Sequence, residues 1–135
     1  ESAFGIEFGT PLSKLDVLRS YLSKNGEKYY SIEVANKIKE EGFTYVVRVA
    51  PEDQKVDEIS AIKKIVAPDF KKECSKQRSE IEKVLPTNFS FGREDVEDTN
   101  VYENNYFTFY LACTDIDNNM VVSFRDERLF RKYFK

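Results

Sequence analysis

Every second residue from Phe43 to Val49, in the segment FTYVVRV, is aromatic or β-branched. Successive side chains of a strand point to opposite faces, so this spacing predicts a strand with one apolar face. Similar runs occur before and after it, and short polar turns join some of them into pairs. The sequence predicts five strands, at residues 28–35, 43–50, 55–66, 106–113 and 120–124.

Two segments have apolar residues at helical spacing. In residues 10–24, TPLSKLDVLRSYLSK, four leucines recur every three or four positions after a Thr-Pro pair that favours a helix start. The second segment, residues 69–85, begins with Asp69, a residue type that caps helices. At the end of the chain, the pattern of residues 125–135 predicts one or two further helical turns. Helices and strands do not alternate one by one. We therefore expect an α+β fold, with a mostly antiparallel sheet of about five strands and two helices packed on one face.

The two clearest hairpin patterns resemble each other. FTYVVRVAPEDQKVDEIS, from Phe43, and FTFYLACTDIDNNMVVSF, from Phe107, both read Phe-Thr-aromatic, β run, polar turn, β run. Each has a predicted helix near it in the sequence. We interpret the chain as a single domain, residues 1–135, that could consist of two degenerate half-units, 1–66 and 67–135, which favours one continuous sheet.

Charge and composition remove several classes of function. The net charge is −3 with both signs mixed along the chain, which argues against nucleic acid as the main partner. There is no histidine, the usual general base and metal ligand near neutral pH. No apolar run approaches the roughly 20 residues of a membrane helix. We expect no catalytic residue, no metal site, no cofactor and no transmembrane segment, so the chain is not predicted to be an enzyme.

Cys74 and Cys113 are the two cysteines of the chain. Cys74 falls on the apolar stripe of the second predicted helix, and Cys113 shares a strand face with Phe107, Phe109 and Leu111. Both should point into the interface between helix and sheet, where a disulfide is geometrically possible. A disulfide would indicate an oxidising compartment. The alternative is a pair of buried free thiols.

Asp115, Asp117 and Asn119 alternate as the first ligands of a calcium loop would. The glycine expected at the sixth place and the glutamate expected at the twelfth are replaced by Met120 and Asp126. Because a β run follows directly, a hairpin turn is the favoured interpretation over a metal site.

The densest acidic segment, with two nearby tyrosines, is the candidate surface for a partner. An acidic loop is often only solvated, but such charge also steers association, and tyrosine is favoured at interfaces. The residues chosen are Glu94, Asp95, Glu97, Asp98, Tyr102, Glu103 and Tyr106.

The start of the chain, FGIEFGTPLSKL, resembles a motif of the SmpA/OmlA-type outer-membrane lipoproteins and of the β-lactamase inhibitor proteins of related fold. Ile6 and Gly9 match that motif, and Leu15 stands where it has Val. Thr10, Pro11 and Lys14 depart from its Met, Thr/Ser and Glu. The resemblance covers about ten residues and implies a small exported bacterial protein that acts by binding other proteins. The absence of an initial Met leaves two interpretations open, a removed signal peptide or an arbitrary cloning boundary.

These observations favour a non-enzymatic exported domain, periplasmic or in the cell envelope, that binds another protein. An inhibitor or immunity role and an envelope-assembly role are both open, as is the oligomeric state. The alternative is a carrier of small apolar ligands, with a pocket between helices and sheet lined by phenylalanine and tyrosine.

Overall fold

The computed structural model describes residues 2–23, 26–83, 90–94, 99–103, 106–115 and 117–133, with the backbone only for 90–94 and 131–133. It contains strands, two α-helices and one short 3-10 helix. Their bounds are β1 Ser2–Ala3, β2 Ile6–Glu7, η1 Leu12–Lys14, β3 Asp16–Leu22, β4 Lys28–Glu33, β5 Phe43–Val49, β6 Val56–Lys64, α1 Phe70–Glu82, β7 Ser90–Glu94, β8 Thr99–Glu103, β9 Phe107–Thr114, β10 Asn119–Asp126 and α2 Glu127–Tyr133.

Eight strands form one sheet in the order β3-β4-β5-β6-β10-β9-β8-β7, and every pair of neighbours is antiparallel. β1 and β2 form a separate hairpin. The large sheet consists of two meanders of consecutive strands, joined where the last strand of each, β6 and β10, pair with Ser60 opposite Ser123. An α+β fold with a mostly antiparallel sheet is confirmed, but the expected five strands are wrong because the sheet has eight.

The helix predicted at residues 10–24 is wrong. Leu12–Lys14 form a single 3-10 turn, and Asp16–Leu22 form β3, which pairs with β4. Leu12 and Leu15 pack against the core as the apolar pattern required, but Leu18 and Leu22 are exposed. In the pairing with β4, Val17 lies opposite Ile32 and Tyr21 lies opposite Tyr29. Valine and tyrosine are residue types that favour strands.

The helix predicted at residues 69–85 is confirmed as α1. The Asp69 carboxylate accepts a hydrogen bond from the backbone N–H of Lys72 at 3.2 Å, which caps the first turn. The hairpin turn predicted in residues 113–124 is also confirmed, since β9 ends at Thr114 and β10 begins at Asn119. Asn118 has a φ of 55°, a conformation that asparagine tolerates well.

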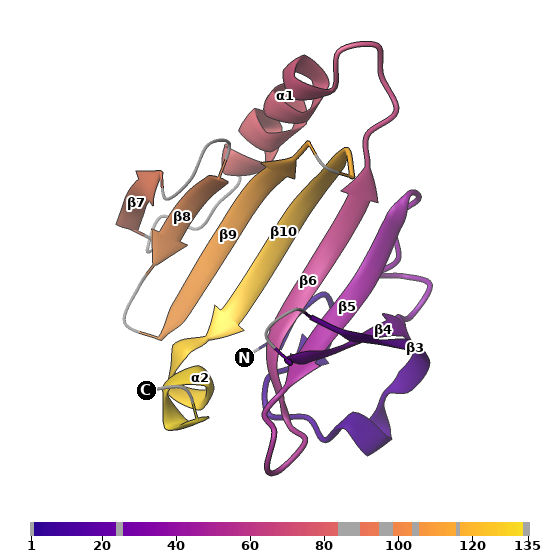
Figure 1. Ribbon diagram of the computed structural model, residues 1–135, viewed down its shortest axis with the longest axis vertical. Coiled ribbons are helices and arrows are strands. Elements are labelled where there is room, and N and C mark those ends of the chain that lie inside the picture. The colour runs from indigo at the N-terminus through magenta and orange to yellow at the C-terminus, as the bar shows by residue number, and fades with distance from the viewer. Residues whose placement is uncertain are drawn as a thin grey trace.

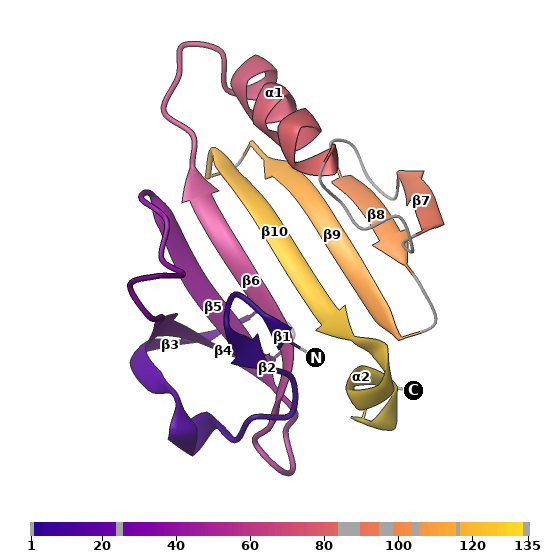
Figure 2. The ribbon, with the colours of Figure 1, turned by 180° about the vertical axis from the view of Figure 1, so that it is seen from behind.

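The two faces of the large sheet differ. On the face that we call the core face, Tyr45, Val47, Ile59, Phe109 and Leu111 are buried. The β1–β2 hairpin covers part of it, with the Phe4 ring centre 5.4 Å from that of Tyr45, and Figure 2 shows this hairpin lying over β6. The opposite face, the open face, carries mainly polar side chains and tyrosines.

The two helices lie at opposite ends of the sheet and on opposite faces (Figure 1). The disulfide between Cys74 and Cys113 attaches α1 to the core face of β9 and confirms the predicted bridge. α2 follows β10 and places Phe130 over Arg125, on the open face. The expectation that both helices pack on one face is therefore wrong, because one of the helices expected there is the strand β3.

Candidate functional site

The residues of the predicted partner surface do not share one environment in the structure. Tyr106 is half exposed and Glu103 is exposed, but Tyr102 is buried on the core face, with its ring 5.9 Å from that of Phe109. Burial, together with the nearby Glu82 carboxylate, raises the pKa of Tyr102 to about 12. Tyr102 is thus a core residue, and its place in the predicted surface is wrong. Glu94 ends β7, where only the backbone is described, and Asp95, Glu97 and Asp98 lie outside the described residues.

Most of the exposed large hydrophobic residues of the described chain lie on β3. All seven residues of this edge strand are exposed, and four of the six exposed large hydrophobic side chains belong to it. They are Val17, Leu18, Tyr21 and Leu22, of which Leu22 is 71% and Leu18 60% exposed. No described strand pairs with its outer side. An edge of this kind presents unpaired backbone N–H and C=O groups to any chain that approaches.

A groove of about 490 Å³ on the open face begins at this edge. Neighbouring strands lie about 4.8 Å apart, so β3 and β10 would be about 19 Å apart in a flat sheet. Residues from both strands line the groove, so it extends across the five neighbouring strands β3, β4, β5, β6 and β10. The groove is lined by Tyr21, Leu22 and Ser23, by Tyr29, by Gly42, Thr44 and Val46, by Ile62 and Lys64, and by Asn119.

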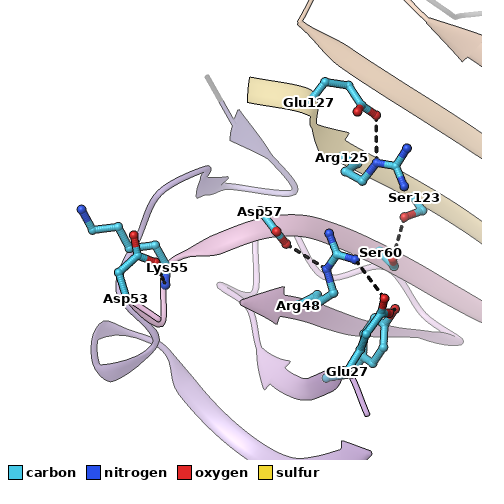
Figure 3. Close-up of polar contacts among 10 residues, drawn as sticks. Glu27, Arg48, Asp53, Lys55, Asp57, Ser60, Ser123, Arg125 and Glu127 are labelled. Carbon is cyan, nitrogen blue, oxygen red and sulfur yellow. Dashed lines mark hydrogen bonds and ion pairs between the residues drawn. The ribbon is translucent and has the colours of Figure 1, made fainter. Parts of the chain in front are cut away.

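Next to the groove, a row of charged residues crosses the open face. Arg48 lies opposite Glu58, and Glu58 lies opposite Arg125. The Arg48 Nε donates to Asp57 Oδ1 at 3.0 Å, and its Nη1 lies 3.7 Å from Glu27 Oε1 (Figure 3). The pairing shifts at Arg48, which brings both Asp57 and Glu58 to its guanidinium.

Burial controls the protonation of this row. It raises the pKa of the Asp57 and Glu58 carboxyls, although Arg48 acts in the opposite direction on both. Burial alone would lower the pKa of Arg48, but its carboxylate partners, Asp57 first, raise it overall. Asp57 is fully buried and so cannot reach a substrate in solution.

α2 rests on the same row. The Phe130 ring centre is 4.0 Å from the Arg125 guanidinium carbon and 4.7 Å from that of Arg48. Glu127 accepts hydrogen bonds from the Thr108 hydroxyl and, at 2.8 Å, from Arg125 Nε. These contacts fix α2 at the end of the sheet, so we assign the charged row a structural role.

A second cavity, of about 370 Å³, lies on the core face. It is bounded by the sheet, by Phe4 of the β1–β2 hairpin, by Ile38 and by Ile81 of α1. Aromatic rings and aliphatic side chains make most of its wall. It matches in kind the pocket between helix and sheet that the carrier interpretation expected.

The sequence predicted the disulfide that attaches α1 to the sheet, but it missed the exposed β3 edge and the open-face groove. The cysteine pair could be found from its matched apolar faces. The exposed edge was hidden by a leucine spacing that fits a helix, although Val17 and Tyr21 are typical strand residues. The groove is lined by residues of five strands that are far apart in the sequence, and no local pattern indicates that they meet.

Comparisons of this chain with protein-family models, with curated proteins and with solved structures found no match. In the described part of the chain, neither α1 nor α2 has the length and apolar character needed to cross a membrane.

Proposed function

We propose that this protein is a non-enzymatic, exported protein-binding domain, which receives an extended segment of its partner along β3. The observation that carries the proposal is the β3 edge, exposed over its whole length and apolar, beside a groove lined by its own Tyr21 and Leu22.

Strand addition fits this surface on two counts. Backbone groups on the outer side of an edge strand can hydrogen-bond a partner strand, and alternate side chains of that strand can enter an adjacent groove. Large exposed hydrophobic groups on an edge favour aggregation unless a partner covers them, and β3 has Arg19 and Asp16 as its only charges. Leu18 and Leu22 are the expected anchors of the contact.

The disulfide supports the exported part of the proposal. Disulfides persist in secreted and periplasmic proteins and are rare in the reducing cytosol. In a bacterial periplasm or cell envelope, two roles fit a domain of this kind. One is inhibition of, or immunity to, another protein, and the other is envelope assembly.

A pair of variants tests the proposed surface. In Leu18→Lys/Leu22→Glu, two exposed leucines become one cation and one anion, so the net charge stays the same. The matched control is Val66→Glu, which introduces a charge at an apolar residue that is 89% exposed and distant from β3 in sequence.

The measurement is affinity capture from the envelope fraction of the native organism. We expect one partner to be retained by the wild type and by Val66→Glu, and lost with Leu18→Lys/Leu22→Glu. Equal retention of the partner by all three forms would refute β3 as the binding surface. A wild-type dimer at low protein concentration, dissociated by the same double variant, would show that β3 pairs with a second copy instead.

A further inference from the structure

The apolar walls of the core-face cavity come from the large sheet, the β1–β2 hairpin, the segment before β5 and α1. Phe4 stands on the β1–β2 hairpin with its ring centre 5.8 Å from that of Phe124, and the Phe124 and Phe109 ring centres are 4.5 Å apart. Ala61 and Val122 form the floor on β6 and β10. Such a wall suits the apolar part of a small ligand.

The polar atom of the tyrosine in this wall is already engaged. The Tyr45 hydroxyl donates to the Ile38 carbonyl at 3.4 Å and accepts from the Glu40 backbone N–H at 3.1 Å. Its ring therefore lines the cavity while its hydroxyl bonds the neighbouring turn. Glu40 is the other polar residue that lines the cavity. It is exposed, and the described part of the chain gives it no ion pair inside the cavity.

The side chain of Lys63 lies beside Phe43, one of the residues that line the cavity. The Lys63 ammonium lies 5.6 Å from the ring centre of Phe43, a wall residue, and donates to Gln77 Oε1 at 3.0 Å. Gln77 lies one helical turn before the wall residue Ile81, and its own amide nitrogen donates to Glu73 Oε2 at 2.9 Å. Gln77 therefore lies between Lys63 and Glu73, and no described carboxylate forms an ion pair with Lys63.

From this arrangement we propose that the core-face cavity binds a small single-chain amphiphile with a carboxylate head, with its apolar chain between Phe4 and Phe109 and its head on Lys63. An ammonium group has three donors, and Gln77 occupies one of them. A cavity of about 370 Å³ is at the small end of ligand sites, which favours a single-chain acid over a two-chain lipid. This site is independent of β3 and lies on the other face of the sheet.

Isothermal titration with decanoate, and with decanol as the uncharged analogue of equal chain length, tests the proposal. We expect decanoate to bind the wild type and Lys63→Met to weaken it by about tenfold, the effect of one charge-assisted hydrogen bond. The affinity for decanol should be the same in both forms. The control Lys64→Met changes the neighbouring lysine, which is exposed and lines the open-face groove instead, and it should leave decanoate binding unchanged.

A second variant tests the apolar chain. Ala61→Leu adds side-chain volume at the floor of the cavity and should abolish binding of both probes. If this variant does not fold, NMR chemical shifts of the wild type, measured on titration with decanoate, replace it as the test. The signals of Tyr45, Ala61 and Val122 should shift. No binding of decanoate, equal effects of Lys63→Met on both probes, or shifts confined to the open face would overturn the proposal. Leu18→Lys/Leu22→Glu should still bind decanoate, which separates this result from the test of β3.

Discussion

Arg48 is the residue on which the open face depends. Its guanidinium is buried and held by Asp57, which is itself fully buried. Replacing a buried ion pair by apolar groups can be neutral, but removing one partner leaves the other charge uncompensated. Arg48 also supports Phe130, so the same residue connects the sheet to α2.

Arg48→Met should lower the free energy of unfolding by about 3–5 kcal/mol, because it leaves the Asp57 carboxylate buried without its cation. Urea denaturation measures this change. Arg19→Met, which removes an exposed arginine on β3, should change stability by less than about 0.5 kcal/mol. Equal effects of the two changes would contradict the structural role of Arg48.

Glu58 should give the protein a measurable pH dependence. Its pKa is raised in the folded state, mainly by burial, above the value near 4.3 of an unfolded glutamate. The folded state then holds the proton more tightly, so stability should fall as pH rises from about 4 through the raised pKa. Glu58→Gln removes the titrating carboxyl group. The difference in melting temperature between Glu58→Gln and wild type should therefore shift in favour of the variant as the pH rises over this range. If the melting temperatures of wild type and Glu58→Gln change with pH by the same amount from pH 4 to about 8, Glu58 titrates normally.

Local sequence patterns predicted those strands and helices that have one apolar face packed against the core. Phe43–Val49 and Phe107–Thr114 have one apolar face each, and α1 has a capping aspartate and a buried cysteine. The pattern failed at β3, where leucine spacing indicated a helix but the partner strand β4 supplied the backbone hydrogen bonds. β8 was missed because its mixed sequence, TNVYE, has no clear strand pattern, although it pairs with β7 and β9 in the sheet.

The disulfide should contribute measurably to the docking of α1 on β9. Cys74 and Cys113 are 39 positions apart, and closing a loop of this length stabilises by about 4 kcal/mol in the chain-entropy model. Cys74→Ala/Cys113→Ala should lower the free energy of unfolding by up to that amount, measured in urea. Reductant should destabilise the wild type to a similar extent and leave the variant unchanged. Insensitivity of the wild type to reductant would contradict this contribution.

At the scale of the whole molecule, the sheet has the layout that two repeated units would give. Each half contributes a meander of four strands, and the last strands of the two halves meet with Ser60 and Ser123 hydrogen-bonded at 2.9 Å (Figure 3). The half-units 1–66 and 67–135 remain a prediction, since the two halves carry different elements before their strands. Joining the halves places β3 and β7 at the two edges of the sheet, so no described strand pairs with the outer side of β3.

Addition of a partner strand to β3 can be measured by amide hydrogen exchange of the complex with the captured partner. Amides of residues 16–22 should exchange much more slowly in the complex than in the free protein, while those of α1 should be unchanged. Protection confined to other elements, with β3 exchanging as in the free protein, would show that the partner does not add a strand to β3.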